Sequence, residues 1–196
     1  MKTLLSLLLL FATRACAQDT FDGCKPTGNA KDSKHMNLNV LKNRFLAPDS
    51  YDTLDFDAFS NLTENQVHQL RGGVLTGYVI GVKQSGGESC NCGQTDPVHV
   101  DTHITIVKDP AHTEGKFRMI CEVTPRIRAA MKKQGIDWTW QTLKKKLLHH
   151  VVQFSGWQLY DWEHEPQAYN TNPKNKLDWR HGCPEIHSIF SYVIIK

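Results

Sequence analysis

The stretch Val74–Gln84, VLTGYVIGVKQ, decides the fold class of this chain. It is rich in β-branched and aromatic residues, a composition typical of a β-strand. Gly77 and Gly81 lie inside it, and glycines in a strand interior are typical of the sharp bends that a small barrel needs. The stretch therefore predicts the first strand of a barrel domain that begins near residue 73.

The segments after Gln84 continue this pattern. Alternating or β-branched runs predict strands over residues 98–107, 117–125, 151–161 and 185–195. Residues 139–150 change to a helical period, with Trp140, Leu143 and Leu147 on one face. The order β-β-β-α-β-β is that of the OB-fold, so we expect a mainly β protein with an OB-fold-like five-stranded barrel. An open α+β sheet with the same order is the alternative.

The first residues indicate export. Lys2 is followed by the apolar run LLSLLLLF, which is too short to span a bilayer, and the small residues of ACA precede Gln18. Residues 1–17 are thus predicted to be a signal peptide, with a mature chain that starts at Gln18 in a secreted or periplasmic protein. A lipoprotein modified at Cys16 is the alternative, although Arg14 fits a lipobox poorly. No later segment is apolar enough to predict a membrane span.

Residues 18–72 are predicted to form a partly helical N-terminal extension before the barrel domain of residues 73–196. Residues 18–35 are polar and contain glycine and proline, which indicates a flexible lead. The segment TENQVHQLRGG begins with a Thr63/Gln66 capping-box pattern and ends at Gly72 and Gly73, so it predicts a short helix.

The charge balance gives weak support for a nucleic-acid partner. The chain has 23 basic and 20 acidic residues, and loss of Lys2 and Arg14 with the signal peptide would leave a net charge of about +1. Basic residues at Arg126, Arg128, Lys132 and Lys133, with the run at 144–146, could bind a polyanion. We interpret the run at 144–146 as a solvated helix face.

The cysteines predict at least one disulfide. If Cys16 leaves with the signal peptide, five remain, which allows at most two bridges and one free thiol. Cys90 and Cys92 are too close in sequence to pair easily, so we expect their loop to be tied to Cys183 or Cys24. Cys121 falls on the core side of its strand and is the expected free thiol. A metal-thiolate role for the Cys-x-Cys pair is the alternative.

Titratable side chains gather on the strands. In VDTHITIV, residues 100–107, Asp101 and His103 share one face, because side chains alternate along a strand. In an OB barrel the second, third and fifth strands are adjacent, so these two residues are expected to meet acidic and histidine side chains of the other two strands on one outer face. The candidate site residues are Asp101, His103, Glu122, Arg126, Asp161, His164, Arg180, Glu185 and His187.

This cluster has two interpretations. As a site, it predicts a divalent metal such as Zn or Mn held by Asp101, His103, Glu185 and His187, because both ions accept mixed histidine and carboxylate ligands. In the second interpretation the cluster has no ligand, and it is a solvated face of the barrel with cross-strand charge pairs.

Several short motifs resemble a group of uncharacterised exported bacterial proteins. They are LNVLKNR (38–44), GYVIGVKQSGGES with the following NC (77–92), DTHI (101–104), EVTPR (122–126), GWQLYDWEH (156–164) and EIH (185–187). The resemblance extends from about Leu38 to the C-terminus. It implies export and the extent of the domain, and it implies no activity.

The sequence therefore predicts an exported binding module for a small or polymeric ligand, with a His/carboxylate site on the barrel. The alternative is a metal-dependent hydrolase, which could act on phosphodiesters. No nucleophile elbow, phosphate loop or dinucleotide-binding motif is present in the sequence to favour another enzyme class.

Overall fold

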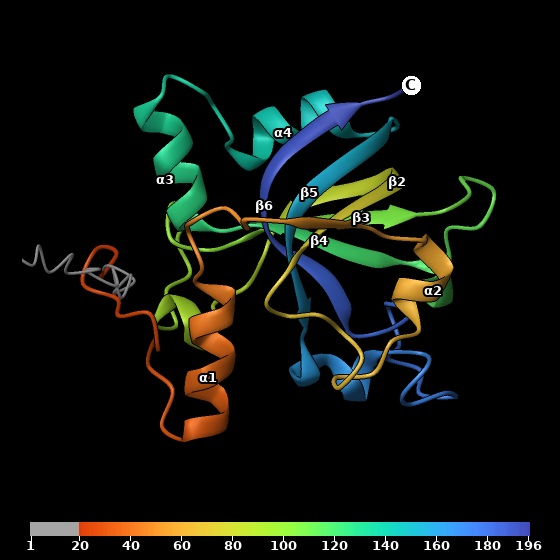
Figure 1. The fold of residues 1–196 in the computed structure, drawn as a ribbon, viewed down its shortest axis with the longest axis horizontal. Helices are drawn as coiled ribbons and strands as arrows, with labels where there is room; N and C mark the ends of the chain where they lie inside the picture. Colours follow the sequence, from red (N-terminus) through yellow and green to blue (C-terminus); the bar gives the residue numbers. More distant parts are fainter. Residues whose placement is uncertain (1–19) are drawn as a thin grey trace, which may run out of the picture.

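The computed structural model describes residues 20–196 (Figure 1). The predicted signal peptide and Gln18 lie outside the described residues. The helices are α1 (Ser33–Lys42), α2 (Phe56–Ser60), α3 (Pro125–Lys133) and α4 (Trp140–Leu147), with short 3-10 turns η1 (Ser89–Asn91), η2 (Gly115–Phe117) and η3 (Trp162–Gln167). The strands are β1 (Tyr51–Thr53), β2 (Gly72–Gln84), β3 (Thr102–Val107), β4 (Met119–Val123), β5 (Val151–Tyr160) and β6 (Pro184–Ile194).

Strands β2 to β6 close into a barrel. The strand order is β1-β2-β3-β4-β6-β5, and β2 also pairs with β5, which joins the two ends of the sheet. The β4–β6 pair is parallel and the other barrel pairs are antiparallel. The short strand β1 adds to β2 in parallel as a sixth strand. The predicted OB-like five-stranded barrel is confirmed, and the β2–β5 pairing rules out the open sheet.

The barrel is filled by one apolar side of each strand. Leu75, Ile104, Phe154 and Ile186 are fully buried members of this core. Helix α4 packs on β2, and Leu143 and Leu147 of its apolar face join the same core. Removal of each such leucine side chain from water stabilises the folded state by about 1.5–3 kcal/mol. The helix predicted over residues 139–150 is therefore confirmed, and its lysines at 144–146 are exposed.

Gly156 permits the close passage of β5 against β6. A Cβ atom at this position would lie 2.2 Å from the carbonyl oxygen of Ser188, which is too close for any side chain. The register between β5 and β6 also shifts on both sides of Gly156. The glycine therefore marks a bend of the barrel wall.

The helix predicted over residues 63–73 is wrong. Thr63 donates its backbone N–H to Gln66 Oε1 at 2.9 Å, which is half of a capping box, but only turns follow before β2 begins at Gly72. The glycine pair that indicated a helix end belongs instead to the start of the long strand. Only Gly72 and Gly73 of the predicted helix pair with β5, and the turns before them are held by contacts such as that of Gln69 Oε1, which accepts from Tyr160 N–H at 3.3 Å.

The flexible lead predicted over residues 18–35 is wrong within its described part, residues 20–35. This part contains the buried Cys24, and the helix α1 begins in it after the N-cap residue Asp32. The side of α1 that packs inward carries Leu38, Asn39 and Lys42. Because this buried side is mostly polar, the helix has no apolar period by which the sequence could have predicted it.

Within residues 20–196, none of the helices has the length and apolar composition that crossing a bilayer requires.

Candidate metal centre

Three titratable side chains form a row across three neighbouring strands. His103 of β3 lies opposite Glu122 of β4, and Glu122 lies opposite His187 of β6. Their strand neighbours Ile104, Cys121 and Ile186 point into the barrel core, so the row lies on the other side of the barrel wall. The strand register therefore places these three residues, which are far apart in the sequence, side by side in one cluster.

This side of the barrel is covered. The exposed fractions of His103, Glu122 and His187 are 7%, 2% and 0%. The expectation of a solvated outer face is therefore wrong.

The β2–β3 loop contacts the cluster, through Glu88 to His103 and through Asn91 to Asp101. Residues 24–43 pack on this loop through the Cys24–Cys92 bond and the Lys42–Glu88 ion pair, and the two segments together form a cover. Asn43 fastens the cover by donating to the carbonyl oxygens of Pro26 and Cys90 at 2.9 and 2.8 Å.

The carboxylate of Glu122 lies between the two histidines. Its Oε1 is 2.8 Å from His103 Nε2, and its Oε2 is 3.5 Å from His187 Nδ1. Asp101, which directly precedes β3, accepts a hydrogen bond from Asn91 Nδ2 at 3.1 Å through Oδ2. Asp101, Glu122 and His187 each offer one ligand atom, and these atoms all lie within 4.8 Å of one another.

Several polar atoms of the cluster are buried without a hydrogen bond. Within the described part of the chain, Asp101 Oδ1, His187 Nε2 and both ring nitrogens of His103 have no hydrogen-bond partner. The 2.8 Å contact between His103 and Glu122 does not have the direction of a hydrogen bond. Buried polar atoms are nearly always satisfied, so atoms such as these indicate a group that completes the site.

Glu185 orients His187. Its Oε1 accepts from His187 Nδ1 at 3.0 Å, and its Oε2 accepts from the buried Arg180 at 2.9 Å. Burial raises the pKa of Glu185, but Arg180 and His187 together outweigh this and lower the pKa below its usual range. Glu185 was predicted to be a metal ligand, but its oxygens are occupied by His187 and Arg180. Glu185 is instead placed like a carboxylate that fixes the tautomer of a ligating histidine. Glu122 lies at the centre of the candidate ligand set in its place.

Lys42 is a buried cation that the sequence did not indicate. Its Nζ lies 2.7 Å from Asp161, 3.1 Å from Glu88 and 3.2 Å from Glu163, and its side chain is 2% exposed. Burial lowers the pKa of Lys42, but Asp161 and Glu88 outweigh it and raise the pKa well above its usual range. The predicted site residue Asp161 is therefore neutralised by Lys42.

The remaining predicted residues lie at the margin of the cluster. His164 Nε2 is 3.4 Å from Asp161 Oδ2. Arg126 donates to Asn43 Oδ1 and to the carbonyl oxygen of Cys24, both at 3.0 Å, so it anchors the cover. Trp179 stacks on His103, with ring centroids 6.4 Å apart.

The metal-free cluster favours protonated histidines. Burial lowers the pKa of His103, but Glu122 and Glu88 outweigh it and raise the pKa to about 10. For His187, burial is likewise outweighed by Glu122 and Glu185, which raise its pKa to about 9. Burial, then Glu88 and Glu122, raise the pKa of Asp101 to about 7. A bound cation would displace these protons.

The disulfide joins the cover to the barrel loop. Cys24 is bonded to Cys92, which confirms one of the two expected pairings. Cys121 is free as predicted, but among the described residues Cys90 and Cys183 are free as well, so the structure has one bridge there and three thiols. Burial, together with Glu88 and Asp101, raises the pKa of Cys90 well above its usual range, which keeps this thiol protonated.

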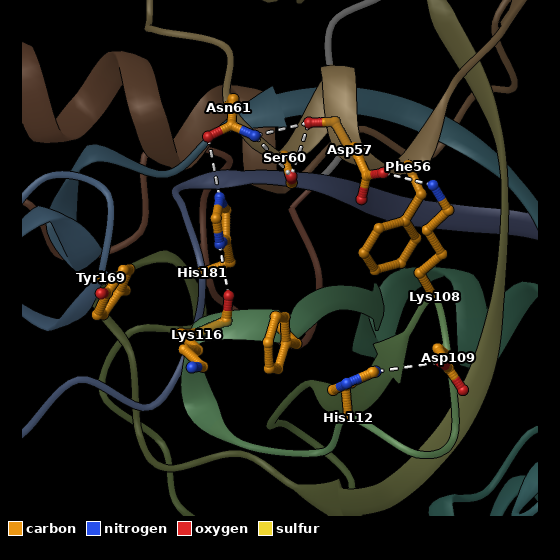
Figure 2. Close-up of a pocket in the computed structure, with 11 residues that line it drawn as sticks. Phe56, Asp57, Ser60, Asn61, Lys108, Asp109, His112, Lys116, Tyr169 and His181 are labelled. Atoms are coloured by element: carbon orange, nitrogen blue, oxygen red, sulfur yellow. Dashed lines mark hydrogen bonds and ion pairs between the residues drawn. The ribbon is translucent and has the colours of Figure 1, made fainter.

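A separate pocket of about 680 Å³ lies beside α2 (Figure 2). Figure 2 shows Lys108 next to Asp57, and His181 between Asn61 and the carbonyl oxygen of Lys116. The polar groups of its wall thus bond to one another. None of the predicted site residues lines this pocket, so it is distinct from the metal centre.

No model of a known protein family matches the chain, and no curated protein is significantly similar to it.

Proposed function

We propose that this protein is an exported OB-like barrel that binds a divalent transition metal ion through Asp101, Glu122 and His187. One observation carries the proposal. These three residues are at most 2% exposed, their ligand atoms lie within 4.8 Å of one another, and Asp101 Oδ1 and His187 Nε2 have no hydrogen-bond partner in residues 20–196.

The donor set favours zinc or manganese. Imidazole and carboxylate ligands bind both ions, with bonds of about 2.0–2.2 Å to zinc, so two ligand atoms of one ion lie roughly 3–4 Å apart. A divalent ion would also offset the repulsion between the buried carboxylates of Asp101 and Glu122. Glu185 would supply the second contact that ligating histidines usually make.

The burial of the centre separates two possible roles. A metal-dependent hydrolase acting on phosphodiesters needs an ion with a coordination position open to substrate. Asp101, Glu122 and His187 are almost inaccessible to solvent. This supports an ion-holding role over hydrolysis at this position, with the ion itself as the small ligand of the predicted binding module.

Export is part of the proposal. The disulfide between Cys24 and Cys92 is compatible with an oxidising compartment, as is the signal-like sequence before Gln18. We therefore place the protein outside the cell or in the periplasm, where it would acquire its metal.

The test is metal content and affinity. Protein freed of metal with a chelator is titrated with Zn²⁺ and Mn²⁺ by calorimetry, and the ions retained after dialysis are counted by mass spectrometry. We expect at least one ion per chain in the parent and a loss of the tightest binding in Asp101→Asn. Asp109→Asn is the matched control, because Asp109 is exposed and paired with His112 at 3.1 Å far from the centre.

Two outcomes decide the proposal. If the parent binds neither ion and a chelator leaves its melting temperature unchanged, the cluster is a network of protonated histidines and carboxylates. If Asp101→Asn and Asp109→Asn retain equal affinity while both stay folded, the ion binds elsewhere.

A further inference from the structure

We propose that the centre holds a second divalent ion, bound by Glu88, His103 and Glu122, with Glu122 as the bridge between the two ions. The inference rests on the proposed function, since it assigns a further ion to the same centre. Glu88, His103 and Glu122 again offer three ligand atoms that lie within 4.8 Å of one another. Glu122 belongs to this group and to the deep group of Asp101 and His187.

The two oxygens of Glu122 face different partners. Oε1 lies 2.8 Å from His103, and Oε2 lies 3.5 Å from His187. A carboxylate whose oxygens are directed to two separate ligand sets is suited to bridge two ions. Ions paired in this way in proteins lie about 3.5–4 Å apart.

Glu88 has one oxygen available for the second ion. Its Oε2 contacts Lys42 Nζ at 3.1 Å, while its Oε1 faces His103 Nε2 at 3.7 Å. Because Lys42 contacts Oε2, Oε1 is left to face the second ion beside His103.

The histidine of this group provides an independent observation. Neither ring nitrogen of His103 has a hydrogen-bond partner among the residues that the structure describes, although the residue is buried. A buried imidazole without hydrogen bonds requires another partner for at least one nitrogen. A metal ion between Nε2 and the two carboxylates provides that partner.

Charge favours two ions over one. Five carboxylates lie around the centre, and Lys42, which contacts three of them, brings one positive charge; the carboxylates are those of Glu88, Asp101, Glu122, Asp161 and Glu163. With neutral histidines, their net charge of −4 falls to −2 with one divalent ion and to zero with two.

The second ion lies nearer the surface than the first. The side chains of Glu88 and His103 are 22% and 9% exposed, whereas that of His187 is 0% exposed. Trp179 stacks on the His103 ring and forms part of this margin. The outer ion should therefore exchange with a chelator faster than the deep ion.

The experiment counts ions in matched variants. Metal-free parent, His103→Asn and His164→Asn are saturated with Mn²⁺, dialysed, and analysed by mass spectrometry and electron paramagnetic resonance. We expect two ions in the parent, with the broadened spectrum of a coupled pair. His103→Asn should hold one ion with the spectrum of isolated Mn²⁺. His164→Asn is the control and should keep two, because His164 belongs to neither ligand group.

Each outcome is decisive. One ion in the parent, unchanged in His103→Asn, overturns the second ion and leaves the proposed function intact. No ion in the parent overturns the proposed function itself. Two ions without magnetic coupling overturn the bridge through Glu122. Loss of both ions from a folded His103→Asn variant, checked by circular dichroism, overturns the claim that the outer group is a separate subsite.

Discussion

Substitution of Lys42 by methionine tests how the centre is held together. The Nζ atom of Lys42 contacts three carboxylates, at 2.7 Å in Asp161, 3.1 Å in Glu88 and 3.2 Å in Glu163. Methionine fills nearly the same volume but carries no charge. Asp161, which is 1% exposed, would then stay buried beside other carboxylates without its cation.

The expected loss is large because the contacts are buried. At an effective dielectric constant of about 20, a charge pair near 4 Å attracts by about 4 kcal/mol, and most of this offsets the cost of removing the charges from water. Removal of one partner eliminates the attraction but leaves the other charges buried. We therefore expect the free energy of unfolding of Lys42→Met to fall by about 3–5 kcal/mol.

Urea unfolding followed by tryptophan fluorescence measures this loss, and an unchanged slope confirms that both proteins unfold in the same way. Lys108→Met is the matched control. Lys108 is also paired with a carboxylate, that of Asp57, but the two side chains are 57% and 64% exposed. Its effect should be far smaller, because solvent screens an exposed pair. Equal effects of the two substitutions would refute the description of Lys42 as a buried cation that the centre requires.

Three further outcomes are expected. Reduction of the Cys24–Cys92 bond, whose partners are 68 residues apart, should lower the free energy of unfolding by about 4 kcal/mol, measured by urea unfolding with and without reductant. With metal removed by a chelator, protonated His103 and His187 should stabilise the fold, because their pKa values are raised. This stabilisation should be complete below about pH 6.5 and be lost as the pH rises through 9 to 10. A melting temperature that rises over this interval would contradict the prediction. N-terminal sequencing of exported protein should begin at Gln18, and a lipid-modified Cys16 would contradict this.

The row across the barrel could be predicted because it depends on a short-range rule. Alternation fixes which side of the wall His103, Glu122 and His187 occupy, and the OB strand order makes their strands neighbours. Neither step needs knowledge of loops. The same rule placed Cys121 on the core side, where the structure has it as a buried free thiol.

The cover over the row could not be predicted in this way. Lys42 reaches Glu88 across 46 residues and Glu163 across 121 residues, and no local pattern specifies such pairs. Helix α1 buries Asn39 and Lys42 beside Leu38, so it lacks the apolar stripe that indicates a packed helix. The buried polar residues of this helix pack against other polar groups instead, such as the Glu88 carboxylate that Lys42 contacts.

The cover also connects the disulfide to the candidate metal centre. Glu88 immediately precedes η1 and Cys92 immediately follows it, so one short turn carries both a proposed outer ligand and a bridged cysteine. The partner of that bridge, Cys24, lies in the same segment as α1, which positions Lys42 against Glu88. Breaking the bridge frees both segments that position Glu88, while Asp101, Glu122 and His187 remain held by the barrel. Reduction is thus predicted to weaken binding of the proposed outer ion more than binding of the proposed deep ion, which metal titration with and without reductant would measure.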